Sequence, residues 1–422
     1  MTVRFLVYLL MKINNMTKDK NIKTAVPELR FPEFKDDGEW KEKKLGEIGK
    51  ASMCKRILKH QTTNIGKNNI PFFKIGTFGR LADAYISEEV FSEFKQKYSY
   101  PNKGDILISA SGTIGRLVVF NGEKAYFQDS NIVWIANNET FVLNVFLYQY
   151  YKTIKWKTSD GGIINRLYNS DLESILVVFP STREQQKIAD CLSSLDDLIN
   201  AVADKIEALR DHKKGLMQRL FPAEGQAVPK FRFPEFEDDG EWKEKTLGKV
   251  ATFINGRAYK QDELLECGKY RVLRVGNFFS NNKWYYSDLE LNDNKFCDKG
   301  DLLYAWSASF GPRIWNEEKV IYHYHIWKVI ENNNITKDFL YFLLGYETSK
   351  IKNQQANGLG LMHITKNSIE NWNTFIPKDK KEQQKIADCL STLDNEIKTQ
   401  SNKLEELKAH KKGLMQKLFP KI

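Results

Sequence analysis

The chain contains a long internal repeat, so its fold has to accommodate two copies of one plan. Residues Arg30–Gly46 recur as Arg232–Gly248 with 15 of 17 positions identical. Further along the chain, Glu184–Ser193 is identical to Glu382–Ser391. The 422 residues therefore form two halves, each with a constant opening block and a constant end block. Recent gene duplication without functional meaning is the competing interpretation, but it does not explain why the blocks and the segments between them diverge so unequally.

Two variable segments, residues 52–175 and 254–372, lie between the constant blocks and share little sequence. Short β-rich runs and one helical pattern occur in each, which predicts two compact mixed α/β units. We expect strands at Ile70–Ile75, Asp105–Ser109, Leu117–Phe120, Asn131–Ile135, Tyr270–Val275, Leu302–Trp306 and Val320–Ile330, and helices at Phe141–Lys155 and Thr336–Lys352. The clearest match between the segments is Lys103-Gly-Asp with Lys299-Gly-Asp.

Each end block predicts one long amphipathic helix, because its apolar residues recur at heptad spacing. The predicted seam consists of Ile188, Leu192, Leu195, Ile199, Val202, Ile206 and Leu209 in the first copy and Ile386, Leu390, Leu393, Ile397, Leu404 and Leu407 in the second. A capping box is expected at each start, from Ser181 with Glu184 and from Asp379 with Glu382.

A helix with one apolar stripe needs a partner. We expect the two helices to pack on each other as a coiled coil within the chain; the alternative is two separate helices that each dock on another subunit. Gln400 and Lys411 occupy seam positions and are expected to fix the register, because polar seam residues do so at a cost in stability. About 38 residues give a helix of roughly 57 Å.

Composition excludes several protein classes. The five cysteines form no paired motif, which argues against a disulfide scaffold or a four-cysteine zinc site and favours a reducing, intracellular setting. No apolar run of 18 residues occurs, as a membrane span would require. The net charge of +10 is mild and permits a polyanionic partner without proving one. Residues 1–25 are expected to be an N-terminal tail, with Met16 as the true start.

Motifs of an autonomous enzyme are missing from the sequence. It has no glycine-rich nucleotide loop, no P-loop, no zinc-protease motif and no nucleophile elbow. Asn69–Phe72 only superficially resembles a methyltransferase motif and is expected to be a turn entering a strand. We therefore expect no catalytic residues and no metal site.

The variable segments carry polar and aromatic side chains of the types that contact base edges and phosphates. The candidates in the first segment are Lys74, Thr77, Arg80, Ser109, Ser111, Thr113, Arg116, Gln128, Asn131, Asn165 and Arg166. The candidates in the second segment are Arg257, Tyr259, Arg274, Asn277, Ser307, Ser309, Arg313, His323, His325 and His363. The loops Ser109–Gly115 and Ser307–Gly311 are favoured, because both follow the shared Lys-Gly-Asp strand. For each residue, surface solvation or a loop-stabilising role is the competing interpretation.

The constant blocks resemble those of the specificity subunits of type I restriction-modification systems. Arg30-Phe-Pro-Glu-Phe, followed by Gly-Glu-Trp40 and Leu-Gly46, is similar to the start of that family's target-recognition domains. Glu184-Gln-Gln-Lys-Ile-Ala and Lys213-Lys-Gly-Leu-Met-Gln are similar to its spacer-helix motifs. Both copies carry these motifs, so the resemblance covers residues 26–422.

The resemblance implies an α/β fold with two mixed α/β target-recognition domains separated by two long helices. These helices would pack as an antiparallel coiled coil in a pseudo-twofold internal repeat. The implied domains are the tail 1–25, the first target-recognition domain 26–178, spacer helix 179–222, a linker with the second target-recognition domain 223–376, and spacer helix 377–422.

The family's function implies that each domain binds one half of a bipartite site in double-stranded DNA, while the helices set the gap. Such a subunit has no catalytic centre. It docks two methyltransferase (modification) subunits and ATP-dependent restriction subunits in a cytoplasmic host-defence complex. We expect no cofactor on this chain, with AdoMet, ATP and magnesium on the partner subunits.

Two other functions need to be distinguished from DNA specificity. A free-standing methyltransferase or nuclease is disfavoured by the missing AdoMet and metal motifs. A structural adaptor whose variable segments bind proteins would lack the steep salt dependence that phosphate contacts give to DNA binding.

Overall fold

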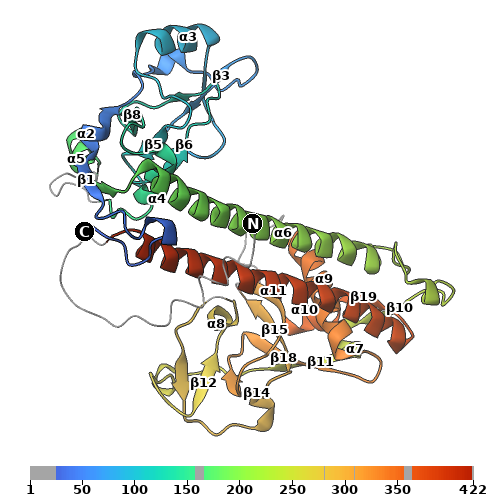
Figure 1. Ribbon diagram of the computed structural model, residues 1–422. Helices are drawn as coiled ribbons and strands as arrows, with labels where there is room; N and C mark the ends of the chain where they lie inside the picture. Colours follow the sequence, from blue (N-terminus) through green and yellow to red (C-terminus); the bar gives the residue numbers. More distant parts are fainter. Residues whose placement is uncertain (1–24, 157–165, 280, 308, 356–363, 421–422) are drawn as a thin grey trace. The chain divides into compact units, whose positions relative to one another are not determined.

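The computed structural model describes residues 25–156, 166–279, 281–307, 309–355 and 364–420 (Figure 1). The chain divides into two compact units, a first unit of Met1–Ala201 with Leu404–Ile422 and a second unit of Val202–Lys403. The two predicted long helices are present as α6 (Thr182–Leu220) and α11 (Lys380–Leu418), each 39 residues long. Each unit therefore contains a part of both helices, and the domain boundaries inferred from the sequence stay predictions.

The first unit is built on an antiparallel four-stranded sheet of order β2-β8-β5-β6. Its strands are β2 (Gly49–Ser52), β8 (Ile132–Asn137), β5 (Ile106–Ser109) and β6 (Leu117–Val119). A smaller sheet of order β4-β3-β7 contains β4 (Tyr85–Ile86), β3 (Ile70–Phe73) and β7 (Tyr126–Phe127). A third, two-stranded sheet pairs β1 (Lys41–Lys44) with β9 (Leu176–Phe179). The helices before α6 are α2 (Leu45–Ile48), α3 (Glu88–Lys97), α4 (Asn144–Tyr151) and α5 (Asn169–Ser174).

The second unit repeats this topology with one additional strand in its smaller sheet, although its variable segment shares little sequence with the first. The four-stranded sheet contains β11 (Ala251–Asn255), β18 (Ile326–Glu331), β15 (Leu302–Ser307) and β16 (Ser309–Ile314) in this order. The smaller sheet contains β13 (Tyr285–Ser287), β12 (Tyr270–Leu273), β17 (Val320–Tyr322) and β14 (Phe296–Cys297), and β10 (Lys243–Thr246) pairs with β19 (Asn373–Ile376). The helices are α7 (Leu247–Val250), α8 (Val275–Phe279), α9 (Lys337–Gln355) and α10 (Lys366–Glu370). The duplication therefore includes the variable segments.

The Lys-Gly-Asp match between the segments is explained by a turn. Gly104 and Gly300 have φ of +96° and +94°, which favours glycine because it has no Cβ. The carboxylate of Asp105 accepts a hydrogen bond of 2.7 Å from the backbone N–H of Asn102, and Asp301 accepts the same bond from Asp298. This turn delivers the chain into β5 and β15, whose apolar residues enter the core.

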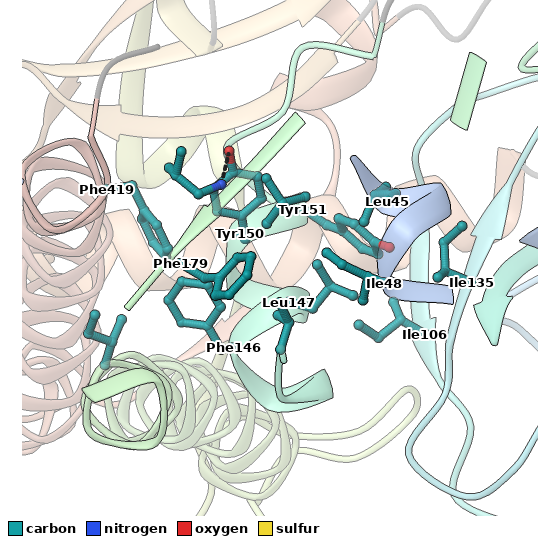
Figure 2. Packing of buried hydrophobic residues seen from close by; sticks show 14 of the residues in the cluster. Leu45, Ile48, Ile106, Ile135, Phe146, Leu147, Tyr150, Tyr151, Phe179 and Phe419 are labelled. Carbon is teal, nitrogen blue, oxygen red and sulfur yellow. Dashed lines mark hydrogen bonds between the residues drawn. The ribbon is translucent and has the colours of Figure 1, made fainter. Parts of the chain in front are cut away.

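The core of the first unit is completed by the end of α11. Trp40 of the opening block, Phe146 and Tyr150 of α4, and Phe419 after α11 are all buried. Figure 2 shows Phe419 beside Phe146 and Tyr150, and the ring centroids lie 5.6 and 5.7 Å from that of Phe419. Complete burial of a phenylalanine contributes about 1.5–3 kcal/mol, so the C-terminal end of the chain stabilises the first unit.

The core of the second unit is completed by the end of α6. Phe221 is fully buried, and its ring centroid lies 6.3 Å from that of Trp242 and 5.5 Å from that of Phe339. Trp242 and Trp40 occupy matching positions of the repeat and are both core anchors. The end of each long helix thus packs into a unit whose opening block comes from the other copy.

The helices pack antiparallel within each unit. In the first unit, Lys411 near the end of α11 is hydrogen bonded to Asp196 of α6. In the second unit, Lys213 near the end of α6 lies 2.6 Å from the carboxylate of Asp394 in α11. Every predicted seam residue is buried or half-buried. The expectation that the two helices pack on each other within the chain is therefore confirmed.

The predicted capping boxes are only half correct. Ser181 Oγ accepts a hydrogen bond of 3.4 Å from the N–H of Glu184, as an N-cap should. The Glu184 carboxylate, however, binds Arg30 instead of reaching back to Ser181. The same holds in the second copy, where Asp379 accepts from the N–H of Lys381 and Glu382 binds Arg232. In both copies the glutamate carboxylate therefore pairs with an arginine distant in the sequence and does not form the local hydrogen bond of a capping box.

Two predicted elements have different limits in the structure. The single strand expected at Val320–Ile330 is two strands, β17 and β18, because the chain passes from the smaller sheet to the larger one at His323–His325. The helix expected from Phe141 begins only at Asn144, because the side-chain amide of Gln185 binds the Phe141 carbonyl and the Leu143 N–H and so holds this segment extended.

Candidate nucleic-acid interface

Hydrogen bonds bring most candidates of the first segment together in one group of loops. We call this group the first loop surface; it consists of residues 53–57, 74–80, 109–116, 128–131 and 166. The Gln128 side-chain oxygen accepts from the N–H of Ile75 at 2.9 Å. Ser111 Oγ donates to the Asn131 side chain at 2.8 Å. These two bonds join segments from three parts of the sequence.

Several of these candidates also support the loops that carry them. Ser109 is buried, donates to the Thr113 carbonyl and accepts from the Arg116 N–H at 2.8 Å. The Arg116 and Arg166 guanidinium groups donate to the carbonyls of Phe78 and Ser130. A residue whose groups are already bonded has fewer left for a base.

The candidates that remain more accessible are fewer. Lys74 forms an exposed ion pair of 2.9 Å with Asp83, and Thr77 hydrogen bonds with the Lys74 backbone. Arg80 and Thr113 are exposed, and no side-chain partner is seen for either among the described residues. Among the candidates selected from the sequence, these two are best placed to reach a ligand.

Sequence reasoning missed basic residues that directly follow β2. Arg56 forms an ion pair of 2.9 Å with Asp129, and the Lys55 ammonium lies 5.2 Å from the centre of the Tyr98 ring. They border a pocket of about 330 Å³ that is lined by Met53, Cys54, Lys55, Arg56, Tyr98, Ser99 and Asp129. Burial raises the pKa of the Cys54 thiol to about 12, so the thiol stays protonated. The internal repeat could have identified Lys55, because Lys55 occupies the position that corresponds to Arg257, which was a candidate in the second segment.

In the second unit, the candidates gather at the corresponding place. We call this group the second loop surface; it consists of residues 255–259, 274–279, 306–307, 313 and 323–325. The Arg257 backbone forms a β-bridge with His323, and the Tyr259 ring stacks on the His323 ring at 6.2 Å. The Arg257 guanidinium forms two hydrogen bonds, of 2.8 and 2.7 Å, with Glu263.

The other cations of the second loop surface lie over aromatic rings. The Arg274 guanidinium lies 4.2 Å from the centre of the Tyr285 ring, and Arg313 donates to the Phe278 carbonyl. Asn277 is buried and donates to the carbonyls of Asn281 and Lys283. Asn277 therefore stabilises a turn, while Arg274 and Arg313 provide positive charge.

His323 is an uncharged imidazole at neutral pH. Burial lowers the pKa of His323 to about 4, together with the smaller effects of the neighbouring His325 and Arg274. His323 and His325 belong to neither β17 nor β18. They lie in the turn between β17 and β18, because the chain changes sheets there.

Three candidates have no described side chain. Asn165 and His363 lie outside the described residues, and Ser309 is described only by its place in β16. Ser307 ends β15, half-buried, and pairs with Ser309 in the sheet. Sequence reasoning also missed Trp306 and Tyr324, which belong to the second loop surface; no residue-type pattern marked them, because only the fold brings them beside His325.

Two negative findings apply to the described part of the chain. No helix there is long and apolar enough to cross a membrane. Nor do its histidines, cysteines and carboxylates form a group of three that could hold a metal ion.

Known proteins share this architecture. A crystal structure of a type I restriction-modification S subunit from M. genitalium superposes with a TM-score of 0.60 at 18% identity, covering 94% of this chain and 99% of that one. A structure from a study of complex assembly and conformational transition of the type I system gives a TM-score of 0.54 at 17% identity, covering 90% and 97%. Both likenesses concern the fold.

Sequence comparison identifies relatives and a family. A putative type I restriction enzyme specificity subunit of Haemophilus influenzae is 58% identical over 160 residues, 38% of this chain and 41% of that protein. A type I restriction enzyme specificity subunit of Methanocaldococcus jannaschii is 25% identical over 370 residues, 82% of this chain and 85% of that protein. The model of the type I restriction modification DNA specificity domain matches residues 37–210 and 239–409. The chain therefore belongs to the family of type I restriction-modification specificity subunits, which are non-catalytic.

Proposed function

We propose that this chain is the sequence-specific DNA-recognition subunit of a type I restriction-modification complex, in which each unit reads one half of a bipartite site. The observation that carries the proposal is the contrast between frame and loops. The larger sheets of both units have the same strand order, yet the two loop surfaces carry unlike side chains. Two units with a similar fold and different loop side chains suit a DNA site with two different halves.

The chemistry of the loop surfaces supports this role. The first loop surface offers amides, hydroxyls and guanidinium groups, which hydrogen bond base edges and phosphates. The second adds aromatic rings and a neutral imidazole. A modest charge suits a subunit that holds DNA together with partner subunits.

The partner subunits are proposed to dock on the constant blocks. Some exposed residues are identical in both copies, such as Asp36 and Asp238 or Lys214 and Lys412. Packing in a core does not explain why these residues are identical. Because the constant blocks occur twice, two modification subunits that carry AdoMet would each bind to one copy of the same surface. ATP and magnesium would belong to the restriction subunits, and the complex would act on DNA in the cytoplasm.

Exchange of a variable segment tests the proposal. The methylated motif of cellular DNA is determined with this gene, without it, and with residues 52–175 replaced by the corresponding segment of another specificity subunit. We expect a bipartite motif that depends on the gene and of which only one half changes after the exchange. A change in both halves would refute the assignment of one unit to one half-site.

The adaptor and enzyme alternatives are tested with the purified chain. Bound alone to duplex DNA, it should lose affinity steeply with salt, because phosphate contacts release counterions. Salt-independent binding would favour an adaptor. Methylation or cleavage by the isolated chain with AdoMet or magnesium would favour an enzyme.

A further inference from the structure

The most distinctive feature of the second loop surface is the turn His323–His325, where the chain leaves β17 and enters β18. Tyr324 projects from this turn with 39% of its surface exposed, although most large aromatic residues of the unit are buried or half-buried. Its hydroxyl has no hydrogen-bond partner among the described residues. The turn therefore presents an aromatic face and a free hydroxyl to whatever binds here.

Hydrogen bonds hold the backbone of the turn in place. The Tyr324 N–H donates to the Arg257 carbonyl at 3.0 Å, and the Tyr324 carbonyl accepts from the Trp306 indole N–H at 2.9 Å. The His323 N–H donates to the Leu273 carbonyl at 2.9 Å. Three neighbouring segments thus fix the position of Tyr324, and a prepositioned contact residue loses little conformational entropy on binding.

A series of aromatic rings in contact with one another connects the turn to the core of the unit. The ring centroid of His325 lies 3.9 Å from that of Tyr324 and 4.9 Å from that of Trp306. Trp306 in turn stacks on the buried Trp327 at 5.5 Å with an interplanar angle of 18°. Trp327 belongs to the core of the sheet, so these ring contacts connect Tyr324 to a rigid element.

Two arginines lie near the turn, and the Arg257 guanidinium is paired with Glu263. Arg257 is bridged to His323, and Arg274 is close enough to lower the pKa of His323. An exposed aromatic residue with arginines nearby fits a polyanion with flat, partly apolar rings, and duplex DNA has both properties.

The first unit has a polar turn at the same topological place. Residues 128–131, between β7 and β8, contain Gln128, Asp129, Ser130 and Asn131 and no aromatic residue. The frame on both sides of the turn is retained while the chemistry of the turn changes completely. This is the behaviour expected of an element that determines which sequence each unit accepts.

We propose that the turn His323–His325 is the specificity-determining element of the second unit and that Tyr324 packs against base edges of its DNA half-site. The ring would contact an apolar edge such as the thymine methyl group, and the hydroxyl would hydrogen bond a neighbouring base. The inference rests on the proposed function, because it assumes that the second unit reads one half-site.

The test measures the methylated motif produced by the complete complex with modification subunits. Loss of a direct base contact relaxes discrimination roughly 5- to 150-fold at the contacted base pair. With Tyr324→Ala we expect this relaxation at one or two adjacent positions of one half-site and no change in the other half. Tyr324→Phe should retain the preference that depends on the ring and lose the one that depends on the hydroxyl.

Two controls keep the outcomes distinct. Ile330→Ala removes an exposed apolar side chain from the strand that follows the turn, β18, and should leave the motif unchanged, while melting curves verify that all variants are folded. An unaltered motif for Tyr324→Ala, or a uniformly slower reaction with the same motif, would overturn the inference. If the wild-type complex produced no bipartite motif, the proposed function itself would fail.

Discussion

At the scale of single residues, one buried ion pair occurs twice. The Arg30 guanidinium binds the Glu184 carboxylate at 2.8 and 2.7 Å and donates to the Gly38 carbonyl. Arg232 and Glu382 repeat this arrangement, and both arginine side chains are 7% exposed. The pair ties the opening block to the start of a long helix, which explains why these residues are identical in both copies.

Removal of one partner of this pair should be costly. Arg30→Met leaves the 1% exposed carboxylate of Glu184 buried without its cation, so we expect a loss of roughly 3–5 kcal/mol. Chemical denaturation measures the change. The double variant Arg30→Met/Glu184→Leu should recover much of the stability, while Arg80→Ala on the surface should stay within about 0.5 kcal/mol of wild type. Equal losses for the single and double variants would contradict this account.

His323 makes the stability of the second unit dependent on pH. In the unfolded chain histidine binds a proton near pH 6.5, whereas in the folded unit the pKa is about 4. Between these values the unfolded state binds more protons, so stability should be complete above pH 6.5 and fall as the pH decreases towards 4. Melting temperatures of wild type and His323→Gln across this range should diverge on acidification. His60→Gln, at an exposed histidine of the first unit, is the control; parallel curves for wild type and His323→Gln would be inconsistent with the prediction.

At the scale of elements, charged pairs define how α6 meets α11. Lys213 and Asp394 are the repeat equivalents of Lys411 and Asp196, so the same contact forms once in each unit. Gln400, also expected to set the register, hydrogen bonds to Glu396 of its own helix. Of the two polar seam residues, only Lys411 therefore contacts the opposite helix in the bonds observed.

A charge reversal tests this pairing. Asp394→Lys places a second cation beside Lys213 and should destabilise the second unit, whereas Lys213→Asp/Asp394→Lys restores opposite charges. We expect a coupling of about 0.5–3 kcal/mol in a double-mutant cycle measured by denaturation. Additive effects of the two substitutions would show that the ion pair does not contribute to the register.

At the scale of the whole molecule, the two copies exchange the ends of their long helices. The backbone N–H of Leu29 donates to the Lys417 carbonyl in the first unit, and Phe231 donates to Arg219 in the second. Phe419 and Phe221 fill the corresponding cores. Each copy alone would lack the segment that closes its core.

Phe419→Ala should therefore destabilise the N-terminal part of the chain. Truncation of a buried phenylalanine costs about 3–5 kcal/mol, and its contacts are with Trp40, Phe146 and Tyr150. Hydrogen exchange resolved by segment should show faster exchange in the first unit and little change in the second. Phe221→Ala is the matched variant and should give the reverse pattern.

Lengthening both helices tests the expectation that they set the gap between the two half-sites. The insertion of seven residues after Ala201 and seven after Glu405 preserves the heptad seam and both Lys–Asp pairs, and it adds about 10.5 Å to each helix. We expect the non-specific gap of the methylated motif to grow by about three base pairs at 3.4 Å per base pair, with both half-sites unchanged. A gap of unchanged length would refute the claim that the helices set the distance between the half-sites.

The sequence by itself determined the repeat, the two long helices and most strands. Heptad spacing is a local, periodic signal, and the apolar run Ile106–Ile108 directly reports a buried strand. The limits of the Val320–Ile330 segment were not predictable, because the strands on both sides of the turn are equally apolar and only the partner sheets separate them.

Only the tertiary structure decided which residues share a surface. Glu184 binds Arg30 across 154 positions, and Trp306, Tyr324 and His325 meet although no spacing announces it. Ser109 was a candidate by residue type, yet its hydroxyl stabilises its own loop. Periodicity records which face of an element is buried, whereas the contacts of a polar group depend on neighbours that the chain brings together only on folding.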